Sequence, residues 1–209
     1  MTEASELAQR LRATVTDERV LAAIASIPRE RFVPAAQRKR AYDNVALPIA
    51  CGQTISQPLV VARMLELLTL RSTDRVLDVG TGSGYHAALL ALLTCHVWTI
   101  EIHPELSALA QRTICELGLD NVTFFIGDGR LGLSDQAPFD AINVAAATGE
   151  SVPAVLEQQL ALDGRLVAPV GTRHQHLIVS RRTAAGLHRE RLEAVRFVPL
   201  VRRPGSAHQ

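Results

Sequence analysis

Residues 75–85, RVLDVGTGSGY, decide the fold of this chain. The apolar run 76–79 is typical of a buried strand, and a glycine-rich turn at 80–84 follows it directly. A helical pattern then occupies 86–93. Strand, glycine turn and helix, in this order, present backbone N–H groups at the carboxyl edge of a parallel sheet, where nucleotide-like ligands bind. The stretch therefore predicts an α/β fold with a ligand site at the glycine turn.

The glycine spacing narrows the class of ligand. A dinucleotide-binding G-x-G-x-x-G would need a third glycine where Tyr85 stands, and no Gly-Lys-Ser/Thr follows as in a P-loop. The G-x-G-x-G spacing with an acid two residues before it resembles the first motif of S-adenosylmethionine-dependent methyltransferases. This resemblance implies cofactor contacts from the strand end and the turn, namely Asp78, Gly80, Thr81, Gly82, Ser83, Gly84 and Tyr85.

Two more acids follow the next two strands. The strand at 97–100 runs into Glu101, about 20 residues past the glycines, where an acid accepts hydrogen bonds from both ribose hydroxyls. The strand at 122–126 runs into Asp128, which would hold an adenine amino group. One such acid is often only a strand-end cap, but three at one sheet edge favour a cofactor site. The expected cofactor contacts here are Glu101, Ile102, Gly127, Asp128 and Gly129.

Composition and charge exclude several classes of protein. The chain has 209 residues, 47% of them hydrophobic, which suits one globular domain. A net charge of +1 gives no bulk attraction to nucleic acid or an anionic membrane, and no apolar run approaches a membrane span. The three cysteines match no zinc or redox spacing, and the N-terminus lacks a signal-peptide core. We expect a cytoplasmic monomer with no metal.

Alternating strands and helices predict an α/β fold, a doubly wound, mostly parallel Rossmann-like sheet with an antiparallel C-terminal hairpin and an N-terminal helical and loop extension. One domain, 1–209, would comprise N-terminal helices and a substrate-side loop (1–70), a cofactor-binding core (71–171) and a C-terminal hairpin and tail (172–209). The expected helices are 5–13, 17–26 with Thr16 as N-cap, 59–70, 86–93, 104–117 and 151–160; the expected strands are 76–79, 97–100, 122–126, 139–144, 165–170 after a turn at 163–164, 176–182 and 188–198.

Residues 28–58, PRERFVPAAQRKRAYDNVALPIACGQTISQP, form the second informative stretch. They are too irregular for a sheet and too apolar for a linker, and a loop of this length is usually functional. Pro58 suits the first turn of the helix that follows. The Ser56 hydroxyl and backbone N–H groups would then gather at a helix N-terminus, a good place for a carboxylate. On general statistics, Ser56 is more often only the N-cap.

The motifs RERFVP, AYDNVALPI, GQTISQP, DVGTGSGYHAALLA, IGDG, APFDAI, DGRLVAPVG and RFVPL, in this order over residues 28–200, resemble the protein-L-isoaspartate O-methyltransferase family. The resemblance implies methyl transfer from S-adenosyl-L-methionine to the free α-carboxylate of L-isoaspartyl residues in damaged proteins or peptides, with S-adenosyl-L-homocysteine as product. It implies Ser56 as the catalytic residue. It also implies cofactor contacts from Gln53, Thr54 and Ile55 and substrate contacts from Thr54, Ser56, Gln57, Pro58, Ala145 and Val201.

Two positions depart from the family pattern, because threonine is usual where Ala145 and Val201 stand. A lost hydroxyl would weaken a contact or alter substrate choice. Two alternatives therefore stay open: a related carboxyl methyltransferase for a dedicated peptide or small-molecule substrate, and a cofactor-binding paralogue without turnover. The intact GQTISQP segment and the three acids argue against the second.

The implied chemistry needs neither a general base nor a metal. A carboxylate is ionised at pH 7, and a sulfonium methyl is already electrophilic. Alignment and desolvation should therefore do most of the catalysis, with Ser56 orienting the carboxylate. We interpret His174 and His176, on one face of an expected strand, as a surface pair rather than metal ligands.

Overall fold

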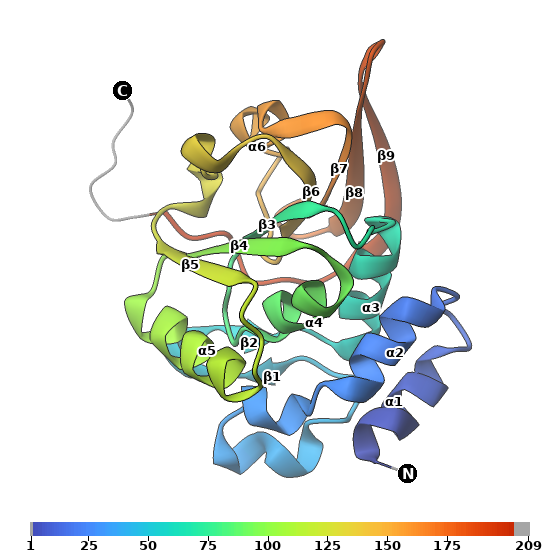
Figure 1. The fold of residues 1–209 in the computed structure, drawn as a ribbon, viewed down its shortest axis with the longest axis vertical. Helices are drawn as coiled ribbons and strands as arrows, with labels where there is room; N and C mark the ends of the chain where they lie inside the picture. Colours follow the sequence, from blue (N-terminus) through green and yellow to red (C-terminus); the bar gives the residue numbers. More distant parts are fainter. Residues whose placement is uncertain (1, 203–209) are drawn as a thin grey trace.

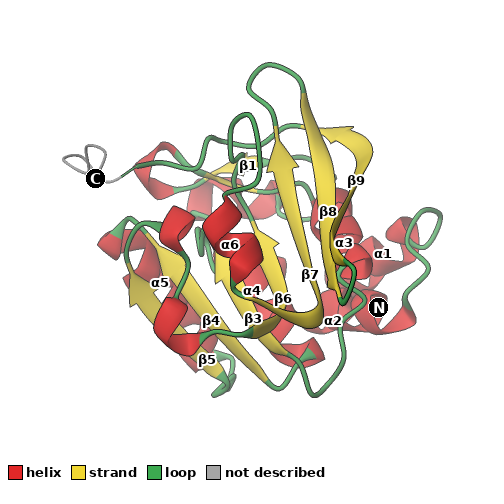
Figure 2. Ribbon diagram, turned by 90° about the horizontal axis from the view of Figure 1, so that it is seen from above, coloured by secondary structure: helices red, strands yellow, loops and turns green. Residues whose placement is uncertain are grey.

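A seven-stranded sheet in the order β5-β4-β3-β6-β7-β8-β9 organises the computed structural model, which describes residues 2–202 (Figures 1 and 2). Residue 1 and residues 203–209, parts of the expected N- and C-terminal segments, lie outside the described residues. Neighbouring strands are parallel from β5 to β7, and β7–β8 and β8–β9 are antiparallel. The expected fold class is thus confirmed. The strands are β3 Arg75–Val79, β4 His96–Glu101, β5 Val122–Ile126, β6 Phe139–Val144, β7 Leu160–Val170, β8 Gln175–Thr183 and β9 Gly186–Val195.

Helices cover both faces of this sheet. In Figure 1, α1 to α5 lie on one side and α6 on the other. Alternation along the strands fills both layers: Val76 and Val167 pack with the larger helical layer, whereas Leu77 and Leu166 pack with the α6 layer. The bounds are α1 Glu3–Leu11, α2 Glu18–Ser26, α3 Pro58–Leu67, α4 Tyr85–Leu93, α5 Pro104–Glu116 and α6 Ala154–Gln158.

The segment 28–58 is more regular than its sequence predicts. It contains a two-stranded antiparallel sheet, in which β1 Leu47–Pro48 pairs with β2 Thr54–Ile55, so the expectation of no sheet here was wrong. Three short 3₁₀ helices complete it: η1 Arg29–Phe32, η2 Ala35–Arg40 and η3 Ala50–Gly52. Pro58 is the first residue of α3, as expected. The small sheet therefore fixes the backbone as far as Ile55, shortly before α3 begins.

The start of α2, the helix expected at 151–160 and the start of β7 differ from the predictions for identifiable reasons. Asp17, not Thr16, is the N-cap of α2, because Glu66 from α3 accepts the backbone N–H and the hydroxyl of Thr16. The expected helix at 151–160 is limited to 154–158, and β7 already begins at Leu160. The expected turn at 163–164 lies inside this strand, where Asp163 has a φ of 61° and the pairing with β6 shifts register.

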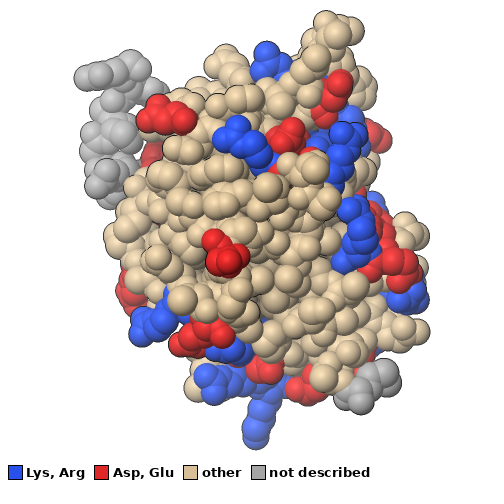
Figure 3. All heavy atoms as spheres, viewed as in Figure 1, with Lys and Arg blue, Asp and Glu red and all other residues tan. Residues whose placement is uncertain are grey.

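The surface carries charges of both signs. In the view of Figure 3, basic and acidic side chains lie next to one another, in keeping with the net charge of +1. Strand β9 is one edge of the sheet, and most of its side chains are exposed. Among the described residues, none of the helices combines the length and apolarity needed to cross a bilayer.

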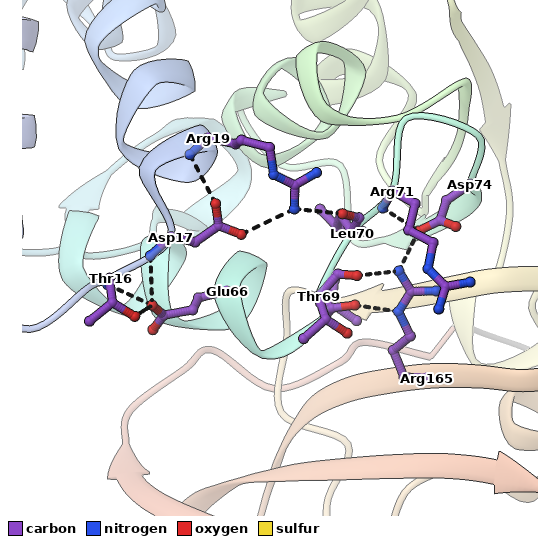
Figure 4. Close-up of polar contacts among 10 residues, drawn as sticks. Thr16, Asp17, Arg19, Glu66, Thr69, Leu70, Arg71, Asp74 and Arg165 are labelled. Atoms are coloured by element: carbon purple, nitrogen blue, oxygen red, sulfur yellow. Dashed lines mark hydrogen bonds and ion pairs between the residues drawn. The ribbon is translucent and has the colours of Figure 1, made fainter.

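Arg165 ties the C-terminal end of α3 to the sheet (Figure 4). Its guanidinium donates to the carbonyl oxygens of Asp140 at 3.0 Å, Thr69 at 2.8 Å and Leu68. It also forms an ion pair with Asp74, and both side chains are buried. Removing one member of such a pair leaves the other charge buried without compensation.

We expect Arg165→Met to lower the free energy of unfolding by about 3–5 kcal/mol, because the Asp74 carboxylate and three carbonyls lose their donor. Arg12→Met is the matched control: its ion pair with Glu18 is exposed on both sides and is worth under about 1 kcal/mol. Urea unfolding of both variants measures the difference. Equal losses would contradict the role given to Arg165.

Candidate active site

A cavity opens at the carboxyl edge of the parallel strands, where the glycine turn lies. It encloses about 700 Å³, including its open mouth. Three separate parts of the chain form its wall: the segment before α3, the strand-end turns and the segment after β9. The predicted site residues on this wall are Gln53, Thr54, Ile55, Ser56, Gly80, Thr81, Gly82, Ser83, Tyr85, Glu101, Ile102, Gly129, Ala145 and Val201.

The glycine turn has the backbone that its sequence predicts. Gly80, Gly82 and Gly84 have φ angles of 90°, 53° and 89°, in the region that only glycine adopts readily. Gly84 is constrained twice, since a Cβ placed on it would lie 2.9 Å from the Cβ of Ala110 in α5. The turn can thus begin α4 while α5 packs closely behind it.

Glu101 links the turn to the loop after β4. One carboxylate oxygen accepts the Gly82 N–H at 2.8 Å, and the other accepts the N–H groups of Ile102 at 2.9 Å and His103 at 3.0 Å. The residue is buried but reaches the cavity wall. Each carboxylate oxygen has two lone pairs, so Oε2, which accepts a single N–H, keeps capacity for a hydroxyl group entering the cavity.

Asp78 lies beneath the turn, not on the cavity wall. It is fully buried and accepts hydrogen bonds from the Asn143 amide and the Thr99 hydroxyl, each at 2.8 Å. Burial raises its pKa to about 6, against the effect of these two bonds. The structure therefore gives Asp78 a supporting place in the sheet, and the expected direct cofactor contact finds no geometric support.

Five more of the expected residues lie outside the cavity wall. Asp128 is engaged by the Arg130 backbone N–H and guanidinium, and caps a short 3₁₀ helix, η4 Gly129–Leu131. Gln57 lines two neighbouring surface grooves instead. The remaining three are Pro58, Gly84 and Gly127.

Ser56 is on the wall, and its hydroxyl makes no hydrogen bond within the described part of the chain. The N-cap of α3 is Gln57, so the alternative that Ser56 is only a helix cap is wrong. The backbone carbonyl of Ser56 accepts a hydrogen bond from Arg29 at 2.7 Å. The hydroxyl is thus held near the cavity with its hydrogen-bonding capacity unused.

Sequence reasoning did not assign several wall residues. Val198, Pro199 and Leu200 reach the cavity because the segment after β9 runs beside Ala147: the Ala147 N–H donates to Val198 at 2.9 Å, and the Leu200 N–H donates to Ala147 at 2.8 Å. The motif RFVPL was the signal for them, although it does not reveal the pairing. The others are Val61, His86, Ile100, His103 and Ala146.

The wall suits a nucleoside cofactor better than a metal. Positive-φ glycines leave the turn without side chains, Glu101 offers carboxylate oxygens, and Ile100 and Ile102 add apolar surface. No group of three or more His, Cys, Asp or Glu able to hold a metal ion occurs among residues 2–202. The His176 ring is 3.1 Å from the Leu192 carbonyl oxygen, and His174 precedes the strand rather than lying on it.

Strand order, glycine turn and the acid at the end of β4 define the class as an S-adenosylmethionine-dependent methyltransferase. The sequence model described as Protein-L-isoaspartate(D-aspartate) O-methyltransferase (PCMT) matches residues 2–205. The chain belongs to the protein-L-isoaspartate O-methyltransferase family.

Individual relatives agree with this assignment. A protein-L-isoaspartate O-methyltransferase of Roseiflexus castenholzii is 53% identical over 91% of this chain and 88% of its own, and one of Aeromonas salmonicida is 50% identical over 93% and 95%. A solved protein-L-isoaspartate O-methyltransferase is 27% identical with a TM-score of 0.84, over 93% of this chain and 64% of that one. A Plasmodium falciparum protein of the same description, in complex with S-adenosyl-L-homocysteine, shares the fold at 24% identity and a TM-score of 0.83, over 96% and 99%.

We expect Glu101→Gln to weaken binding of S-adenosyl-L-methionine at least about tenfold, because hydrogen bonds to a charged group are worth about 1.5–3 kcal/mol each. The amide NH₂ would also face backbone N–H groups that now donate to a carboxylate. Calorimetric titration measures the Kd. Glu105→Gln, an exposed residue of α5, is the control and should stay within about twofold; a similar Kd for both variants would contradict the role of Glu101.

Proposed function

We propose that this protein transfers a methyl group from S-adenosyl-L-methionine to the free α-carboxylate of L-isoaspartyl residues in damaged proteins or peptides. The observation that carries the proposal is the placement of Ser56. Its hydroxyl has no hydrogen-bond partner among residues 2–202 and lies on the wall of the cavity that also holds the glycine turn and Glu101. Family membership and the 50–53% identical relatives support the same activity.

The reaction makes few demands on the protein. When bound, S-adenosyl-L-methionine supplies a sulfonium methyl; the carboxylate oxygen bonds to the methyl carbon as the carbon–sulfur bond breaks, giving a methyl ester and S-adenosyl-L-homocysteine. The carboxylate is already ionised at pH 7, so no residue has to remove a proton. The protein aligns the carboxylate and excludes water. We assign the first task to the Ser56 hydroxyl, which donates to a carboxylate oxygen.

The cofactor would occupy the side of the cavity made by the strand ends. Glu101 Oε2 would accept a hydrogen bond from a ribose hydroxyl, and Ile102 and Gly129 would flank the adenine. Residues 80–83 and Tyr85 would line the rest of this side, and residues 53–55, from the segment before α3, would contact the cofactor across the cavity. Asp128, which precedes Gly129, would contact the cofactor from the edge of the cavity. Asp78 would support the glycine turn from beneath.

The position of the free α-carboxylate in a peptide decides whether that peptide is a substrate. An isoaspartyl linkage offers an α-carboxylate that an ordinary aspartyl linkage lacks, so placement beside Ser56 discriminates between them. Ala145 and Val201, which replace the family's usual threonines, both lie on the wall and offer methyl groups there. The resulting methyl ester is open to attack by the neighbouring backbone N–H, which expels methanol, gives a succinimide and begins repair of the linkage.

Methyl transfer from labelled S-adenosyl-L-methionine to matched isoaspartyl and aspartyl peptides tests the proposal. We expect base-labile methyl incorporation into the isoaspartyl peptide alone, since only that peptide has the free α-carboxylate. Transfer to neither peptide, with cofactor binding intact, would overturn the proposal in favour of a dedicated carboxylate substrate or of binding without turnover. Transfer to both would contradict the discrimination assigned to carboxylate placement.

We expect Ser56→Ala to lower turnover on the isoaspartyl peptide at least about tenfold, because loss of one oriented hydrogen bond to a charged group costs about 1.5–3 kcal/mol. The Kd of S-adenosyl-L-methionine should change little. Ser134→Ala, an exposed serine in a short 3₁₀ helix, is the control. Turnover of Ser56→Ala within twofold of the unmodified protein would show that the assigned role is wrong.

A further inference from the structure

Arg29, the first residue of η1, is a buried cation directly behind the segment that carries Ser56. Its side chain has no exposed surface. Nε donates to the carbonyl oxygen of Ala41 at 2.8 Å, and Nη2 donates to that of Ser56 at 2.7 Å. The guanidinium carbon lies 4.8 Å from the centre of the Tyr85 ring, at the start of α4. One side chain therefore joins the Ser56 segment to the helix that follows the glycine turn.

The charge on Arg29 has no carboxylate partner among the described residues. The adjacent carboxylate, Glu30, accepts the Tyr42 hydroxyl, and Arg29 forms no ion pair. Its Nη1 is buried without a hydrogen-bond partner. Burial lowers the pKa of Arg29, while the two tyrosines, Tyr85 first, act against this effect. A buried cation without a counterion costs free energy, so a purely structural tie between two carbonyls would be served better by a neutral donor.

Little else holds the backbone at Ser56. Strand β2 ends one residue earlier, at Ile55, and α3 begins at Pro58, which has no N–H to donate. On the far side, the Asn44 side chain accepts the Leu59 N–H at 3.0 Å. Between these two anchors, the Arg29 bond is the hydrogen bond that reaches Ser56 in the described structure. The direction of the Ser56 hydroxyl thus depends on the guanidinium behind it.

We propose that Arg29 is a positioning residue for methyl transfer, which aims the Ser56 hydroxyl at the substrate carboxylate by binding the Ser56 carbonyl while its guanidinium lies over the Tyr85 ring. The proposal rests on the function proposed above, because it assigns Arg29 a task only if Ser56 orients a carboxylate. It distinguishes Arg29 from Arg31 of the same 3₁₀ helix, whose guanidinium pairs with Glu116 at the surface.

A double-mutant cycle tests whether Arg29 acts through Ser56. Arg29→Lys keeps the charge but loses the pair of N–H donors that reach Ala41 and Ser56. We expect it to lower kcat on the isoaspartyl peptide about tenfold, because a small misplacement of the Ser56 hydroxyl slows methyl transfer. The KM of the peptide and the Kd of S-adenosyl-L-methionine should stay within about threefold. In the Ser56→Ala background the same substitution should lower kcat by less than about twofold, because the hydroxyl that Arg29 aims is gone.

Two other variants sharpen the test. Arg29→Met, which lacks the charge and every donor, should lose more kcat than Arg29→Lys, so that lysine gives partial rescue. Arg31→Lys is the matched control and should leave kcat unchanged. A kcat for Arg29→Lys within twofold of the unmodified protein would overturn the proposal. So would a full additional tenfold loss in the Ser56→Ala background, which indicates a general structural role. If Arg29→Met does not fold, the lysine cycle still decides.

Failure of the proposed function is distinguishable from failure of this inference. If the unmodified protein methylates no isoaspartyl peptide, the function fails at that step, before any variant is compared. Amide hydrogen exchange then tests the positioning directly. Faster exchange at residues 54–57 in Arg29→Lys, with β3 and β4 unchanged, is the expected result. Unchanged exchange at residues 54–57 would overturn the assignment of Arg29.

Discussion

Two buried carboxylates hold the glycine turn in place, and the rest of the site depends on this constraint. Asp78 accepts hydrogen bonds from Thr99 on β4 and Asn143 on β6, so it ties β3 to both of its neighbours directly below the turn. Glu101 accepts the Gly82 N–H from the turn itself. A turn rich in glycine loses much conformational entropy on folding, and these fixed acceptors offset that cost locally. The turn therefore meets a ligand with its backbone already arranged.

The two sides of the cavity are built by different physical means. The strand-end side is rigid, because parallel pairing and buried carboxylates fix each residue that faces the ligand. The Ser56 side is an ordered loop. It is held by the small β1–β2 sheet and by the buried side chain of Arg29. Such loops carry functional side chains when a rigid scaffold supports them. The buried guanidinium of Arg29 ties this loop to the rest of the fold.

Features that depend on local chemistry were predictable from the sequence. Strands β5 and β6 have the predicted bounds, and Glu101 lies where the strand-end argument places it, since alternation and turn residues act over a few positions. Features set by distant partners were not. Glu66 displaces Thr16 from its cap, and Asp78 turns inward because Thr99 and Asn143 bond it there. The neighbouring sequence also does not predict that Arg29 is buried, because arginine is rarely buried without a carboxylate partner.

The segment after β9 has a consequence for the order in which the site forms during synthesis. Residues 198–201 complete the cavity wall by pairing beside Ala147, near the end of the chain, whereas the strands that hold the glycine turn lie between residues 75 and 144. A domain generally folds as one unit. The cavity is therefore complete only once residues 198–201 have been made, although the residues that hold the glycine turn and Ser56 precede them in the chain.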